Sequence, residues 1–232
     1  DNYFVDRDKT PRDKDGNFDF EVLEAMDVEF LDQQINQLFS GEEVEIPKFD
    51  FAQGKRVFVG NKIKLQEKDI LIMEGIHGLN PKLTKHIDPV KIFRVYASAL
   101  TSLSLDENNN ISTSDSRLLR RIVRDGSFRG MTPENTIIRW PSVRRGELNN
   151  IFPFQENADI MFNSALIYEL PLLKYYAEPL LRRIPPNSPA STESIRLLKF
   201  LSYIQELQPQ EIALIPPTSI IREFIGGSSF VY

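Results

Sequence analysis

Residues 69–80 read DILIMEGIHGLN, and this stretch decides which class of fold the sequence predicts. The run ILIM at 70–73 contains no polar residue, which is typical of a strand that is buried on both faces of a parallel sheet. Glu74 ends the run. Because ligands bind at the carboxyl ends of the strands in an open α/β sheet, Glu74 is a candidate for chemistry. The alternative is a solvated glutamate in a turn.

The rest of the sequence predicts a mixed fold. Segments 91–99 (KIFRVYASA) and 158–162 (ADIMF) read as two further core strands, separated by helical stretches in the βαβ rhythm of a parallel sheet. Residues 18–41 have apolar side chains at helical spacing, and residues 43–65 contain two alternating segments that predict a hairpin. The predicted fold class is α/β: a parallel sheet with flanking helices, a small β-hairpin lobe and a helical carboxyl-terminal region.

Length and composition exclude several classes of protein. The chain has 232 residues and no Cys, so disulfides and thiolate metal sites are excluded. No apolar run approaches the roughly 18 residues that a membrane span needs. We therefore expect a cytoplasmic protein without a membrane partner. The pattern is helical from residue 164 to residue 204, and residues 215–229 read mostly as loop.

Positive charge is concentrated in one part of the chain. Residues 117–145 contain eight Arg against two carboxylates, whereas the formal net charge of the whole chain is −5. A mildly acidic protein with one guanidinium cluster is better suited to a small polyanion such as phosphate than to a nucleic acid.

A helix is predicted around residues 117–124, with two different faces. Leu118, Leu119, Ile122 and Val123 fall on one side of it, and Arg117, Arg120, Arg121 and Arg124 fall on the other. Like charges three and four residues apart repel each other. Four arginines in one stripe are therefore expected to gather an anion; the alternative is a solvated basic face that pairs with nearby carboxylates.

Several segments resemble the phosphoribulokinase/uridine kinase family of P-loop kinases, in this order and at about these separations. They are DNYF (1–4), FDFEVLEAMD (18–27), IPKFDF (46–51), DILIMEGI (69–76) and RLLRRIVRDGSFRG (117–130). The closing part is similar to a bacterial subgroup labelled uridine kinase-like. The resemblance implies a kinase-like α/β domain over residues 1–165, with its hairpin lobe near 43–65, and a mainly helical extension over residues 166–232 packed on it.

The resemblance also implies the roles of the reacting groups, with ATP and Mg²⁺ as cofactors. Asp1 matches the carboxylate that takes the proton from the acceptor hydroxyl, and Glu74 matches the acid that holds Mg²⁺. Arg124 and Arg129 match residues of a lid that stabilise the transferring phosphoryl group, a task suited to guanidinium groups.

The acceptor is expected to be a small hydroxylated, nucleoside-like compound. The resemblance implies six substrate-binding positions, namely Tyr3, Phe4, Glu21, Phe49, Arg121 and Arg139. Glu21 stands where uridine-cytidine kinases have an aspartate for the ribose hydroxyls. Phe49 and Arg139 replace groups that read the base, so pyrimidine specificity is not expected, and Arg139 suits an anionic acceptor.

The phosphate-binding motif of the family, G-x-x-x-x-G-K-S/T, is not found in this sequence. Gly54 and Lys55 are followed by Arg56 instead of a hydroxyl residue, and Phe49 stands at the first glycine. Without that loop there is no backbone cradle for the phosphates. We expect the chain to be the carboxyl portion of a longer kinase and to be inactive alone.

A second class of function stays open. A non-catalytic module that binds RNA or a phosphorylated metabolite would also use the arginine stripe. Related kinases assemble into homo-oligomers, which is a further expectation here. His77 follows Glu74 by three residues; it is either a ligand or a structural hydrogen-bonding residue, and the second is favoured for a lone His in a turn.

Overall fold

A computed structural model of the protein describes residues 1–101, 104, 107 and 110–230. The last two residues of the predicted 166–232 region therefore lie outside the described residues.

The chain divides into two compact units, and each is described by itself. Unit 1 consists of Asp1–Tyr96 and Val143–Ile160, and unit 2 consists of Ala97–Ser142 and Met161–Tyr232.

Unit 1 is built around the helix α1, Val28–Phe39. The Asp27 carboxylate caps it by accepting a 3.1 Å hydrogen bond from the Phe30 amide, which satisfies one of the free N–H groups at a helix start. The sequence pattern predicted a helix from residue 18, but the chain before Asp27 is occupied by a short 3₁₀ turn and by a bridge between Phe4 and Met26. Apolar residues of α1 pack into a small core, namely Leu31 and Ile35 against Leu23, Leu83 and Ile87.

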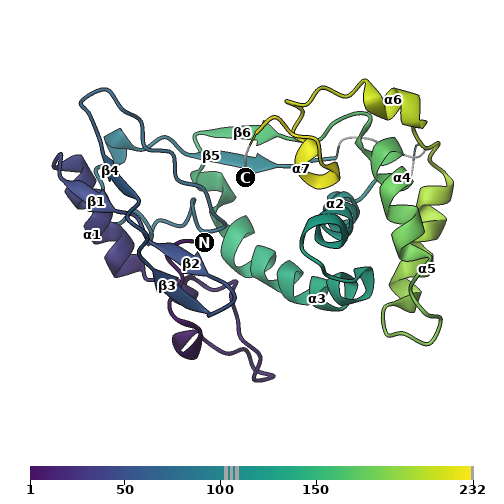
Figure 1. The fold of residues 1–232 in the computed structure, drawn as a ribbon, viewed down its shortest axis with the longest axis horizontal. Coiled ribbons are helices and arrows are strands. Elements are labelled where there is room, and N and C mark those ends of the chain that lie inside the picture. Colours follow the sequence, from purple (N-terminus) through teal and green to yellow (C-terminus); the bar gives the residue numbers. More distant parts are fainter. Residues whose placement is uncertain (102–103, 105–106, 108–109, 231–232) are drawn as a thin grey trace. The chain divides into compact units, whose positions relative to one another are not determined.

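Residues 43–64 form two antiparallel strand pairs, one nested within the other in the sequence (Figure 1). The outer pair joins β1, Glu43–Glu45, to β4, Lys62–Lys64. The inner pair joins β2, Lys48–Asp50, to β3, Lys55–Val57. The Gln34 side chain on α1 donates a 2.8 Å hydrogen bond to the Glu45 carbonyl, so the helix and the strands are tied together.

A small parallel sheet joins β5, Val95–Ser98, to β6, Ile160–Asn163. The Arg94 carbonyl accepts from the Ile160 amide, and the Ser98 carbonyl accepts from the Ser164 amide at 2.9 Å. Because both partners advance in the same direction, the strands are parallel. Both strands were expected from the sequence, and the prediction of a mixed α/β fold with a parallel sheet is confirmed.

The prediction of a buried strand at residues 69–73 is wrong. These residues belong to none of the described strands, and Ile70 and Ile72 are each 86% exposed. Only Leu71 packs against the core of unit 1. An apolar run is buried as a central strand only where neighbouring strands and helices cover it, and no described segment pairs with this one.

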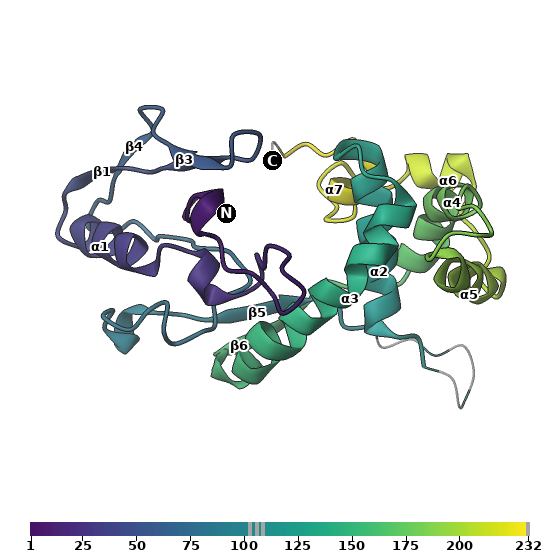
Figure 2. The same ribbon diagram turned by 90° about the horizontal axis from the view of Figure 1, so that it is seen from below.

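Unit 2 holds most of the helices, together with the larger apolar core. The helices are α2 (Thr113–Phe128), α3 (Pro133–Gly146, which ends in unit 1), α4 (Glu169–Leu181), α5 (Ser191–Ser202), α6 (Pro209–Ala213) and α7 (Arg222–Ile225). Figures 1 and 2 both show α2 beside α4 and α7, and α4 beside α5. The single-turn α7 lies in the segment that the sequence pattern assigned mostly to loop.

The shorter helical turns complete the list of elements. They are 3₁₀ turns at Arg7–Lys9, Leu23–Ala25, Pro89–Lys91 and Phe152–Asn157 and a π-helical turn at Glu147–Ile151. None of the helices in the described part of the chain combines the length and the apolar character that crossing a membrane requires.

The two faces predicted for α2 are present, with one correction. Leu118, Leu119, Ile122 and Val123 are completely buried in the core of unit 2. Arg120 was predicted on the open arginine side, but it is buried as well.

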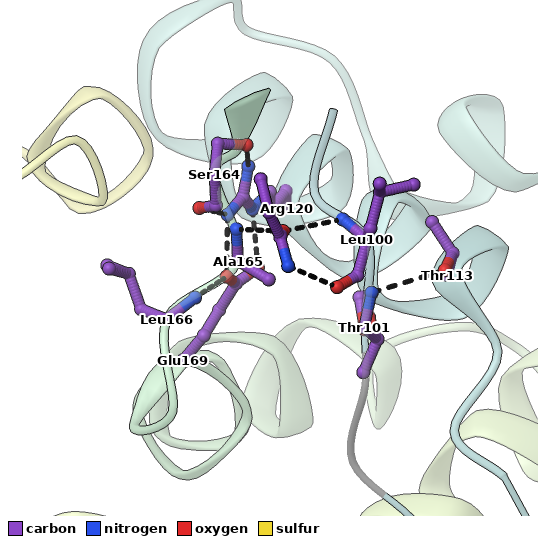
Figure 3. Close-up of polar contacts among 10 residues, drawn as sticks. Leu100, Thr101, Thr113, Arg120, Ser164, Ala165, Leu166 and Glu169 are labelled. Carbon is purple, nitrogen blue, oxygen red and sulfur yellow. Dashed lines mark hydrogen bonds and ion pairs between the residues drawn. The ribbon is translucent and has the colours of Figure 1, made fainter. Parts of the chain in front are cut away.

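A carboxylate from another helix explains this burial. The Arg120 guanidinium forms an ion pair with the buried Glu169 carboxylate at the start of α4, and its Nη2 donates to the Ser164 carbonyl at 2.9 Å (Figure 3). A buried arginine is tolerated only when it is paired and hydrogen-bonded in this way.

Removing one partner of this pair should destabilise the protein strongly. We expect Glu169→Ala to lower the free energy of unfolding by about 3–5 kcal/mol, because it leaves a buried guanidinium without its counter-ion. Chemical denaturation monitored by circular dichroism measures the loss.

A surface ion pair provides the control for this prediction. Glu193 pairs with the half-exposed Arg196 at 2.7 Å, so Glu193→Ala should cost less than about 1 kcal/mol. Replacing both buried partners, as Arg120→Met with Glu169→Leu, should recover much of the lost stability. Equal losses in the two alanine variants would contradict the expected role of the buried pair.

Candidate functional site

The residues predicted for the site fall into two groups, one in each unit. Unit 1 contains Asp1, Tyr3, Phe4, Glu21, Phe49 and Glu74, and unit 2 contains Arg121, Arg124, Arg129 and Arg139.

The aromatic candidates in unit 1 are largely used in packing. Phe49 is 5% exposed, and its ring packs edge-on against Phe4, with 5.6 Å between the ring centroids. The Tyr3 hydroxyl donates a 2.8 Å hydrogen bond to the Gln34 side chain on α1. Burial raises the pKa of Tyr3, and the nearby Arg56 guanidinium opposes this shift, so the hydroxyl stays protonated and remains a donor at neutral pH.

Two carboxylates of unit 1 are open to solvent. Asp1 and Glu74 are both exposed. In the part of the chain that the structure describes, no group of three or more His, Cys, Asp or Glu side chains is arranged to hold a metal. Mg²⁺ does not need such a cage, because it keeps several waters and uses one or two carboxylates together with substrate phosphates. Glu74 is exposed, but residues 69–73 form none of the described strands, so the reason for expecting it at the edge of a sheet no longer holds.

The Glu21 side chain packs closely against Gly146, a residue that is not in the set predicted from the sequence. A β-carbon added at Gly146, the last residue of α3, would lie 2.7 Å from the Glu21 β-carbon and 2.9 Å from its γ-carbon. The Glu21 amide donates to the Asp19 carboxylate at 3.0 Å. Glycine in a helix costs roughly 1 kcal/mol relative to alanine, and a glycine within a helical pattern is a signal of close packing that could have identified this contact.

His77 is buried inside unit 1, with 2% of its surface exposed. Burial lowers its pKa, while the Val22 backbone and the Glu24 carboxylate act in the opposite direction. The ring is therefore neutral at neutral pH. Among the described residues, neither ring nitrogen has a hydrogen-bond partner within normal distance, so the hydrogen-bonding role favoured from the sequence is not seen, and the burial of the ring argues against ligand binding.

In unit 2, the Asp125 carboxylate on α2 lies among basic side chains. Its side chain is almost completely buried, and it lies 3.4 Å from the Arg121 Nε and 3.8 Å from the Arg129 Nη1. The Thr136 hydroxyl on α3 donates to it at 3.2 Å. One carboxylate thus holds two of the predicted arginines close together and reduces the repulsion between them.

Arg124 is paired with a different acid. Its Nη1 donates a 3.0 Å hydrogen bond to the Glu223 carboxylate on α7, and its guanidinium carbon lies 5.6 Å from the centroid of the Phe224 ring. Burial and then repulsion from Arg124 lower the pKa of Arg129, and Asp125 opposes this. Arg129 nevertheless stays charged at neutral pH.

The arginine side of α2 therefore combines features of both predictions made for it. Arg121, Arg124 and Arg129 pair with carboxylates, as expected for a basic face that neutralises itself. All three remain partly exposed, so a small anion can still reach them. Arg139 on α3 is exposed.

Glu223 is absent from the set predicted from the sequence. It lies almost a hundred residues beyond Arg124 in the chain, in a segment that reads mostly as loop. The spacing of Ile221, Phe224 and Ile225 is a weak helical signal that could have suggested α7.

Comparison with known proteins identifies the family of the chain. The profile of the phosphoribulokinase / uridine kinase family matches residues 4–167, which is more than half of the chain. The chain belongs to this family. The family resemblance expected from the sequence is therefore confirmed, and residues 168–232, with Glu223 among them, lie beyond the matched region.

Individual relatives include three bacterial proteins named uridine kinase. The protein of Macrococcus caseolyticus (strain JCSC5402) is 33% identical over 138 residues, which are 59% of this chain and 58% of the relative. That of Lactobacillus helveticus (strain DPC 4571) is 26% identical over 69% of this chain and 68% of the relative. That of Staphylococcus aureus (strain JH9) is 28% identical over 69% and 70%, respectively. The chain thus spans under three fifths of the first relative and about two thirds of the other two.

A methyl group at position 146 should disturb the contact with Glu21. We expect Gly146→Ala to destabilise the protein by roughly 1–3 kcal/mol, because the new carbon overlaps the Glu21 stem. Gly126→Ala is the matched control, since a β-carbon there meets the two Leu180 methyls at 3.3 and 3.7 Å and alanine favours the helix. Thermal and urea unfolding of both variants test this, and a Gly146→Ala protein as stable as the Gly126→Ala protein would contradict the predicted overlap.

The buried His77 should make stability depend on pH. Its pKa is lower in the folded state than the ordinary value of 6.5, so below about pH 6.5 the unfolded chain binds a proton that the folded chain does not. The contribution of the neutral His77 ring to the free energy of unfolding is fully present above that pH. It is lost as the pH falls toward the folded pKa, and the free energy of unfolding then decreases by at most about 1.4 kcal/mol per pH unit. His77→Gln should remove this part of the slope between pH 7 and 5, and an unchanged slope in His77→Gln would rule out His77 as its source.

Proposed function

We propose that this protein acts in an ATP-dependent kinase reaction that transfers the γ-phosphate of ATP to a hydroxyl of a small nucleoside-like acceptor. The main support is the family match over residues 4–167. The three relatives are named uridine kinases, which supports a nucleoside as the class of acceptor.

The proposed roles follow the chemistry of phosphoryl transfer, which depends on alignment, charge neutralisation and a base near the nucleophile. Asp1 accepts the proton of the attacking hydroxyl, and Glu74 holds Mg²⁺. The magnesium ion, when bound, neutralises charge on the phosphates. Arg124 and Arg129 stabilise the negative charge of the transferring group with their guanidinium donors.

Recognition of the acceptor is assigned to a carboxylate and two further arginines. Glu21 can accept hydrogen bonds from two neighbouring hydroxyls, since each carboxylate has several acceptor positions. Arg121 contacts the acceptor, and the exposed Arg139 suits an anionic group on it. Tyr3, Phe4 and Phe49 shape the site through their packing rather than through direct polar contacts with a base.

Asp1→Asn tests the proposed base. We expect kcat to fall on the order of 10²- to 10⁴-fold with little change in KM, because the substitution removes proton acceptance and keeps the shape of the side chain. Magnesium-dependent transfer of label from γ-labelled ATP to a panel of nucleosides and their phosphates provides the measurement and identifies the acceptor.

Arg182→Gln is a suitable control in the same assay, since this exposed residue at the end of α4 forms an ion pair with Glu178 of the same helix. Unchanged transfer by Asp1→Asn would exclude Asp1 as the base. If the wild-type protein transfers nothing and instead binds RNA with an affinity that falls steeply with salt, the kinase proposal is replaced by the binding module.

A further inference from the structure

We propose that α7 is part of the arginine site of unit 2, and that Glu223 and Phe224 on it position Arg124 for an anionic phosphoryl group. This inference rests on the proposed function. It extends the site into residues 168–232, which lie beyond the region matched to the family.

The first observation is that α7 is firmly attached to the core of unit 2. Ile221 is completely buried and Phe224 nearly so. The Arg222 guanidinium donates to the carbonyls of Ile212 and Ile215 at 3.3 and 2.5 Å. α7 therefore has a fixed place beside α2, and the Glu223 carboxylate is held where it meets Arg124.

The second observation concerns the surroundings of Arg124. Glu223 accepts its Nη1 hydrogen bond at 3.0 Å. The Phe224 ring lies 5.6 Å from the Arg124 guanidinium carbon and 5.1 Å from that of Arg120, within the range of cation–π attraction. Arg120 is itself fixed by Glu169. The Arg124 guanidinium therefore lies beside the buried Phe224 ring, and one of its N–H donors is bonded to Glu223.

Such anchoring is useful to an anion site for two physical reasons. A free arginine loses about 2 kcal/mol of rotamer entropy when it is ordered, and a group that is already ordered does not incur that cost when the anion binds. Glu223 also offsets the repulsion among Arg121, Arg124 and Arg129.

The pairing leaves binding capacity on Arg124. A guanidinium has five N–H donors. One of those of Arg124 is bonded to Glu223 and its Nε is buried, so the remaining Nη donors are the ones left for a phosphate. The Arg124 side chain keeps 24% of its surface exposed and Glu223 keeps 33%, which gives a small anion access to this pair.

The opposite role for Glu223 would be that of an internal anion that competes with phosphate for Arg124. The firm attachment of α7 favours positioning over competition.

The two roles predict effects of opposite sign on binding. The probe is inorganic pyrophosphate, titrated by calorimetry into the 232-residue chain and its variants. We expect Glu223→Gln to weaken pyrophosphate binding several-fold, because the anion must then order the Arg124 side chain itself. Glu223→Asp should restore part of the affinity, and Phe224→Leu should weaken binding less than Glu223→Gln does.

Two further variants serve as references in the same titration. Arg124→Gln should lower the affinity at least as much as Glu223→Gln. Glu178→Gln makes the same chemical change on α4, where the carboxylate pairs with the exposed Arg182 at 2.6 Å, and should have no effect. Circular dichroism and thermal unfolding check that each variant is folded.

Tighter or unchanged binding in Glu223→Gln would overturn the inference, as would a wild-type chain that binds no pyrophosphate or an Arg124→Gln variant that binds it normally. Failure of the proposed function shows up separately, in the transfer assay. In a protein that transfers phosphate, Glu223→Gln should lower kcat by up to about 10²-fold, the loss that a misplacement of about 1 Å can cause, and leave the KM for the acceptor unchanged. A merely structural role would lower activity only in proportion to the folded fraction.

Discussion

The buried ion pair between Arg120 and Glu169 is the interaction on which the arrangement of the arginine helix depends. Two charges taken out of water are stable only when they are paired closely and their remaining hydrogen-bonding groups are satisfied, and the Ser164 carbonyl supplies the further acceptor. The pair fixes α2 against α4 at one rotation about its axis. That rotation sends Leu118 and Ile122 into the core and leaves Arg121 and Arg124 at the surface.

The arginines at the surface of α2 and its C-terminal end are paired with carboxylates and yet stay partly exposed. Asp125 and Glu223 lie within ion-pair distance of Arg121, Arg129 and Arg124, and without these acids the like charges would repel one another. A guanidinium that donates to one carboxylate still has free donors. A cluster balanced in this way can stay ordered in the absence of ligand and still offer a positive surface to a phosphate.

In unit 1, close packing is the main constraint on the candidate residues. Phe4 and Phe49 share an aromatic cluster, the Tyr3 hydroxyl is bonded to α1, and Gly146 leaves room for the Glu21 stem. The residues that resemble a substrate site therefore also form part of the core of this unit. Substitutions among them change stability and recognition together, which is why each functional measurement needs a stability measurement beside it.

The sequence alone determined the family, the helical character of α2 with its apolar face, and the two strands of the parallel sheet, because these depend on local periodicity and on the order of motifs. It could not decide whether the apolar run at 70–73 would be buried, since burial depends on which other segments cover it. Nor could it separate Arg120 from Arg121, two neighbours with the same local pattern. Only the tertiary structure decided that Arg120 meets Glu169 and that Arg124 meets Glu223, because these carboxylates come from helices 49 and 99 residues further along the chain.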